Sequence, residues 1–95
     1  MNFDQLVHQP TRLQIFAHLY VHGETEFTGL VDALDVTEGN LSSHLQTMED
    51  ADAVAVEKTF VDRRPRTTYR LTDEGRAAFE GHVETLEALI EGLED

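Results

Sequence analysis

Two short amphipathic segments, joined by only a few residues, place the tightest constraint on how this chain of 95 residues can fold. In the first segment, apolar side chains recur at helical spacing: Leu30, Val31 and Leu34. The second runs from about residue 38 to 50 and repeats them at i, i+4 and i+7: Leu41, Leu45 and Met48. Because the connection is so short, the two helices must be neighbours, and the pattern predicts a helix-turn-helix.

Polar residues indicate where these helices begin. Thr28 is suited to cap the first, and Thr37 is suited to cap the second, with Glu38 in the first turn where the helix dipole favours an acid. Upstream, Pro10 suits a first helical position and Gly23 a C-terminal stop, so a further helix is expected from residue 10 to about 21. These segments together predict a core of three helices.

A β-hairpin is expected directly after the second helix. Residues 54–60 are rich in β-branched and apolar side chains, and residues 67–71 form a second such run. The residues between them are polar and include Pro65, so we expect a loop longer than a two-residue turn, with the exposed tip at 61–66. A third, brief strand is expected near 24–27. The hairpin would form a wing beside the helix pair.

The C-terminal segment, 72–95, predicts one long helix capped by Thr72. Its apolar residues follow a 4-3-4-3 spacing, which is typical of a helix-pairing seam. The seam could pair two copies or pack onto the chain's own helices. We expect Phe79 to pack within the chain and a dimer interface formed by Phe3, Val83, Leu86, Leu89, Ile90 and Leu93.

The charge is strongly acidic but unevenly distributed. Seven basic and nineteen acidic residues give a net charge of −12, whereas nucleic-acid-binding domains are usually basic. Five of the seven basic residues lie between positions 37 and 70, and eight acids lie in residues 71–95. One Lys against six Arg, with abundant acids, also suits a cytoplasm of high salt, where charges are closely screened.

Two sets of side chains are candidates for DNA contact. The outward arc of the second helix holds uncharged polar residues that suit base edges: Asn40, Ser42, Ser43, Gln46 and Thr47. An ordinary solvated face is the other interpretation. The wing carries arginines that suit phosphates or a narrow minor groove: Arg63, Arg64 and Arg66. The alternative for these is a solubilising turn, or pairing with Asp62 and Glu57.

Other classes of function find little support. Without cysteine there is no disulfide framework, thiol nucleophile or Cys-ligated zinc site. His18 and His22 are four residues apart, but no third ligand supports a metal site, and we expect no cofactor. No nucleophile has a convincing base, so an enzyme is not expected. Neither a signal peptide nor a membrane span is indicated, which favours the cytoplasm.

The segments LSSHLQTME and RPRTTYRLTDEGRAAF carry a resemblance that extends over essentially the whole chain. The first segment resembles the recognition helix of the ArsR/MarR-like winged helix-turn-helix regulators. The second resembles their wing and the start of their dimer helix. The resemblance implies an α+β, mostly α fold, with residues 1–71 forming the core, helix pair and wing, and 72–95 a dimerisation helix, all within one domain of residues 1–95.

The same resemblance implies a homodimer on double-stranded DNA. The helix at about 38–50 would enter the major groove, and the wing at 61–66 would lie on the backbone or in the minor groove. To the two sets already named we add the capping residue and the lysine beside the wing: Thr37 and Lys58.

The chain also departs from the pattern of these regulators. Asp52 stands where such proteins usually have Gly, although Asp tolerates left-handed geometry. The cysteine motifs of the metal-sensing members are absent, so metal sensing is not inherited. The sequence names no small-molecule effector. The alternative function is a winged-helix protein-interaction module that does not bind DNA, motivated by the repulsion between a charge of −12 and DNA.

Overall fold

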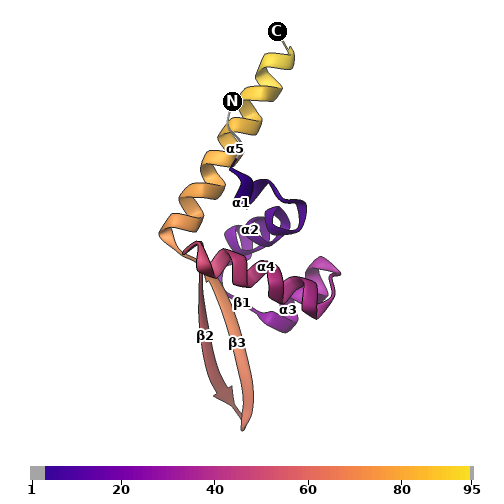
Figure 1. Ribbon diagram of the computed structural model, residues 1–95, viewed down its shortest axis with the longest axis vertical. Coiled ribbons are helices and arrows are strands. Elements are labelled where there is room, and N and C mark those ends of the chain that lie inside the picture. The colour runs from indigo at the N-terminus through magenta and orange to yellow at the C-terminus, as the bar shows by residue number, and fades with distance from the viewer. Residues whose placement is uncertain (1–3, 95) are drawn as a thin grey trace.

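The computed structural model describes residues 4–94, in which three helices form a core between two projections (Figure 1). The elements in chain order are α1 (Gln5–His8), α2 (Pro10–His22), β1 (Thr25–Glu26), α3 (Phe27–Leu34), α4 (Glu38–Asp50), β2 (Val54–Val61), β3 (Arg64–Leu71) and α5 (Asp73–Glu94). The β2–β3 hairpin extends from one end and α5 from the other, over 58 × 25 × 21 Å. This is a mostly α winged helix-turn-helix, as predicted.

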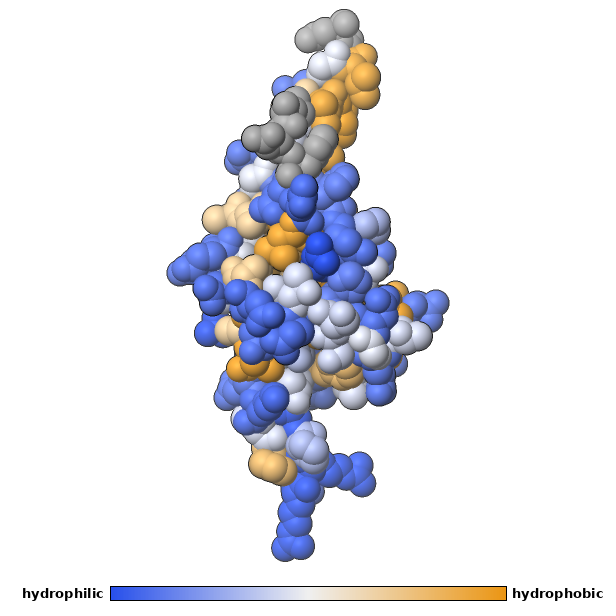
Figure 2. Space-filling model, viewed as in Figure 1, coloured by the Kyte–Doolittle hydropathy of each residue, from blue (hydrophilic) through white to orange (hydrophobic). Residues whose placement is uncertain are grey.

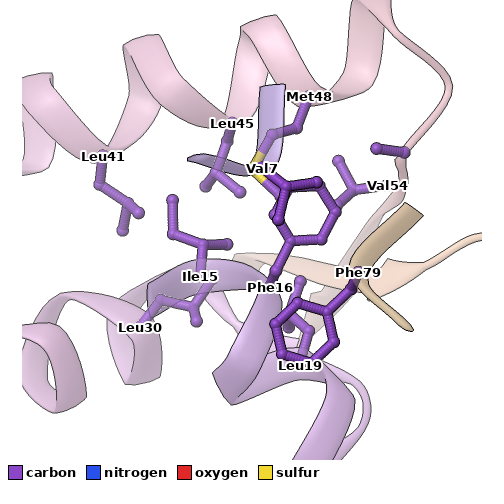
Figure 3. Close-up of a cluster of buried hydrophobic side chains, with 11 residues drawn as sticks. Val7, Ile15, Phe16, Leu19, Leu30, Leu41, Leu45, Met48, Val54 and Phe79 are labelled. Carbon is purple, nitrogen blue, oxygen red and sulfur yellow. The ribbon is translucent and has the colours of Figure 1, made fainter. Parts of the chain in front are cut away.

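The core lies where α2, α3 and α4 meet the base of the hairpin and the start of α5 (Figure 3). Leu41, Leu45 and Met48 are buried on the inner side of α4, as their spacing predicts. Phe79 of α5 stacks on Phe16 of α2, with ring centroids 6.2 Å apart, so the expectation that Phe79 packs within the chain is confirmed. The first turns of α5 therefore belong to the core.

The helix-turn-helix begins one residue earlier than its expected cap. We expected Thr28 to cap α3, and this was wrong: the helix begins at Phe27, and Glu26 holds the capping position without a side-chain hydrogen bond. Because β1 runs directly into the helix, Thr28 already lies in its first turn. The second cap is confirmed, since the Thr37 hydroxyl accepts a hydrogen bond from the amide of Asn40 (3.2 Å).

The hairpin ends in a tighter turn than we expected. The strands run on to Val61 and from Arg64, so the predicted loop at 61–66 is wrong, and only Asp62 and Arg63 remain in the turn. Both have positive φ (51° and 66°), as a type I′ turn requires. Pro65 fits because it opposes Phe60. In a two-residue hairpin this second pair is not hydrogen-bonded, so the missing amide of Pro65 costs no ladder bond.

A close joint connects the end of α4 to the start of α5. The Thr72 amide donates to the carbonyl of Ala53 (3.1 Å), and the Thr72 hydroxyl accepts from the amide of Gly75 (3.0 Å), which confirms Thr72 as a cap. Gly75 lies so close to Ala53 that a Cβ there would overlap its backbone. Asp52 adopts the left-handed conformation (φ 58°) that the sequence anticipated.

Candidate nucleic-acid interface

The outward face of α4 presents the uncharged polar residues that the sequence singled out. All of them are exposed: Asn40, Ser42, Ser43, Gln46 and Thr47. Two are tied locally, since Gln46 donates to Asp50 (2.9 Å) and Thr47 donates to the carbonyl of Ser43 (3.2 Å). The carboxylates of α4 lie at its two ends, so a stretch of nine residues, 39–47, offers donors and acceptors without negative charge. Such a face suits base edges and phosphates.

A residue that sequence reasoning passed over holds α4 in place. Arg12 of α2 donates to Nδ1 of His44 on α4 (3.2 Å) and to the carbonyls of Leu6 (2.7 Å) and Gln5 (3.2 Å) in α1. Burial, and secondly the charge of Arg12, lower the pKa of His44. The lowered pKa favours the neutral ring, whose Nδ1 can accept from Arg12. The one basic residue in the first 36 positions was the signal that could have drawn attention to Arg12.

The distal half of the wing carries cations that the protein itself does not neutralise. Lys58, Arg63 and Arg64 are exposed, and within residues 4–94 they form no ion pair or hydrogen bond. The hairpin as a whole, residues 54–71, has five basic and two acidic side chains, a net charge of +3 within a chain of −12. Arginine forks free at the end of a narrow hairpin suit phosphate oxygens.

Arg66 stands apart from the other wing arginines. Its Nε lies 2.7 Å from Oε1 of Glu26, in the two-residue strand β1, and both side chains are about half exposed. The alternative partners considered from sequence, Asp62 and Glu57, are not the ones it uses. The pair bridges a groove of about 670 Å³ between the wing and the start of α3, whose lining includes Lys58 and Phe27. Glu26 therefore ties the wing to β1 and competes with any phosphate for Arg66.

The distal half of α5 is apolar on one side and uncovered (Figure 2). Four large side chains of the expected dimer interface are exposed there: Leu86, Leu89, Ile90 and Leu93, the last two at 55% and 85%. Val83 differs, because it is partly buried against the chain's own core. Phe3, also expected at the interface, lies outside the described residues. The structure thus brings the seam to one surface without showing what covers it.

The histidine pair considered from sequence lies at the end of α2. The rings of His18 and His22 are 4.5 Å apart, and burial, followed by the charge of His22, lowers the pKa of His18. Among residues 4–94, no cluster of three His, Asp or Glu side chains is placed to hold a metal ion. In the same described range, no helix combines the length and apolar composition needed to cross a membrane.

Comparison with known proteins identifies the same architecture. Residues 11–90 match the family described as "Winged helix DNA-binding domain". Over 83 residues the chain is 32% identical to uncharacterized protein MJ0432 of Methanocaldococcus jannaschii, covering 87% of this chain and 90% of that protein.

Solved structures of other proteins show the same fold. A transcriptional regulator homologue from Pyrococcus horikoshii is 33% identical with a TM-score of 0.89, over 95% of this chain and 89% of that one. A MarR-family regulator from Enterococcus faecalis is 28% identical (TM-score 0.77, covering 93% and 78%). MepR of Staphylococcus aureus, solved with DNA, shares the fold at 18% identity (TM-score 0.79, covering 95% and 73%). The fold and family are those of transcriptional regulators, not of enzymes.

Proposed function

This chain belongs to the winged-helix DNA-binding domain family, and from that premise we propose that it regulates transcription as a homodimer that binds double-stranded DNA sequence-specifically. Helix α4 enters the major groove with Asn40, Ser42, Ser43, Gln46 and Thr47, and Thr37 meets the backbone at its start. The wing lies on the flanking backbone or minor groove through Lys58, Arg63 and Arg64. Arg66 contributes less, because Glu26 already neutralises it.

One observation carries the proposal. In a chain of −12, the acids are absent from the middle of α4, and the three unpaired cations lie in the distal half of the hairpin that follows it. A polar surface evolved only for solubility would have no reason to exclude carboxylates from one helix face. Binding of a polyanion to that face and to the wing does give such a reason, because each carboxylate there would repel a phosphate.

The exposed seam of α5 supports the homodimer. Burying a Leu or Ile side chain contributes about 1.5–3 kcal/mol, and four such residues per chain lie uncovered on one side of a helix. A second copy covers them with an identical surface, as twofold pairing requires. Two α4 helices related by that axis would read two half-sites about one DNA turn, ~34 Å, apart.

Selection of bound fragments from random DNA, followed by salt titration of the best site, tests the proposal. We expect a twofold-symmetric consensus, and replacing Gln46 or Asn40 by Ala should change the preferred bases. The double variant Arg63→Ala, Arg64→Ala should weaken binding to all DNA sequences alike. It should also reduce the magnitude of the slope of log K against log salt by about 2, since each phosphate contact contributes ~0.9. Arg70→Ala is the matched control, because Arg70 is exposed at the other end of β3. Absence of selective binding at every salt concentration would refute the proposal.

A winged-helix module that binds a protein instead of DNA is the alternative, favoured by the net charge of −12. It predicts a stoichiometric basic partner whose binding survives loss of Arg63 and Arg64. The same double variant therefore separates the two functions, because DNA binding requires these arginines and the module does not.

A further inference from the structure

An aromatic side chain at the tip of the wing is not used by the proposed function. Phe60, near the end of β2, is 77% exposed. It opposes Pro65 of β3, and in this non-hydrogen-bonded pair the two side chains lie close together on one face of the hairpin. Val61, the next residue, is also exposed. Neither Phe60 nor Pro65 belongs to the hydrophobic core of the protein.

The charges around this pair indicate what covers it. Lys58 lies two residues before Phe60 on the same face of β2, and Arg63 and Arg64 form the tip immediately beyond it. All three cations are unpaired within the described residues. An apolar group surrounded by free cations complements a surface that is anionic outside and apolar inside. A DNA groove has this composition, with phosphates along its rims and stacked bases and sugars between them.

We propose that Phe60, supported by Pro65, is an apolar wedge that contacts the bases in the minor groove when the wing docks on DNA. This deepens the proposed function and rests on it. The two-residue turn makes the tip narrow enough to approach the groove, while the arginines hold the two phosphate rims. Apolar side chains inserted at a base step partly unstack it, so the wedge favours steps that deform easily, such as TA and CA.

Substitutions at Phe60 and at the arginines should affect DNA binding differently. Loss of a cation changes the dependence on salt, because fewer counterions are released. Loss of the wedge removes a contact that salt does not screen. Phe60→Ala should therefore weaken binding about tenfold or more at every salt concentration without altering the slope. Thr59→Ala is the matched control, since Thr59 is also exposed but lies on the opposite face, and this variant should bind as the unchanged protein does.

A direct measurement uses the absence of tryptophan from this chain. Phe60→Trp places the only indole at the tip of the wing, and its emission reports contact with bases. Adding a selected DNA site should quench that emission, and more strongly when the flanking step is TA than when it is a stiff A-tract. The exposed position of Phe60 means that the variant is expected to fold normally, which circular dichroism checks.

The outcomes distinguish the two proposals. If the unchanged protein binds no DNA selectively, the proposed function fails and the wedge fails with it. If it binds DNA, but Phe60→Ala binds equally well and the Phe60→Trp emission is unchanged on binding, the wedge alone is overturned. Quenching by a basic protein partner, with none by DNA, would likewise overturn it and favour the protein-interaction module.

Discussion

The wing hairpin and the long helix α5 leave the core in opposite directions and have opposite chemistry (Figure 1). The hairpin, residues 54–71, carries a net charge of +3, whereas α5, residues 73–94, has seven acids and one Arg, a net charge of −6. Apolar residues are exposed on both, but on the hairpin they are confined to Phe60, Val61 and Pro65 near the turn, whereas on α5 they form a continuous seam. The net charge of this chain is therefore a poor guide to its partners, because the two signs are assigned to separate surfaces.

This separation implies that salt acts in opposite ways on the two projections. Screening weakens the attraction between the wing and DNA phosphates. The same screening relieves repulsion among the acids of α5, and between the two acidic helices if a second copy pairs along the seam.

The largest effect is expected from a charge placed within the seam. Ile90→Glu should convert the dimer to a monomer and weaken operator binding about a hundredfold or more, because a monomer loses the second half-site. Light scattering after gel filtration and a DNA titration measure the two results. Ala88→Glu adds the same charge at an exposed position of α5 outside the seam and should change neither. A dimeric Ile90→Glu protein would show that the seam is not the interface.

The second prediction compares the effect of salt on the stability of the fold with its effect on DNA affinity. Between about 0.01 and 1 M salt the screening length falls from roughly 30 to 3 Å. Over this range we expect the melting temperature to rise by about 5–10 °C, while DNA affinity falls steeply. Calorimetry and DNA titration in the same buffers measure both. A melting temperature that does not change with salt would contradict the view that repulsion among the acids destabilises this protein.

The third prediction concerns the ion pair between Glu26 and Arg66 of the wing. Glu26→Gln should free Arg66 and raise DNA affinity by about threefold, consistent with the small energy of an exposed ion pair. Asp32→Asn provides the control, because it removes one exposed acid from α3 without touching Arg66. If both variants bind DNA equally well, the gain comes from net charge and not from release of Arg66.

The smallest effect is expected from His44. Its pKa in the fold is lowered from 6.5, so the fold favours the neutral ring. The stability that this contributes is present above pH ~6.5 and is lost as the pH falls toward the lowered pKa. His44→Gln keeps an acceptor for Arg12 but does not titrate. It should therefore lose less stability than the unchanged protein between pH 7 and 5 in denaturant melts, and parallel curves for the two proteins would contradict this.

Local signals allowed the sequence to predict much of the fold. The spacing of Leu41, Leu45 and Met48 and the caps at Thr37 and Thr72 depend on residues within a few positions of one another, and all agree with the structure. The outward face of α4 follows from the same periodicity. These features need no knowledge of the rest of the chain.

Features that depend on strand pairing or on packing between elements could not be predicted from the sequence. The turn at Asp62 and Arg63 was taken for part of a longer loop, because Pro65 is usually a strand breaker and only its pairing with Phe60 shows that it fits. The Glu26–Arg66 and Arg12–His44 contacts join residues 40 and 32 positions apart and depend on how the elements pack. The exposure of Phe60 likewise follows from the length of β2, which periodicity does not reveal.

The joint at Ala53, Thr72 and Gly75 has a mechanical consequence. The end of α4 and the beginning of α5 are held there by backbone contacts so close that not even a methyl group fits at Gly75. Little bending is available at that point, so each α5 moves as one unit with the α4 of its own chain. In the proposed dimer, a change of a few degrees in the crossing angle of the two α5 helices would therefore move both α4 helices. The distance between the α4 helices would then no longer match the distance between the two half-sites on the DNA.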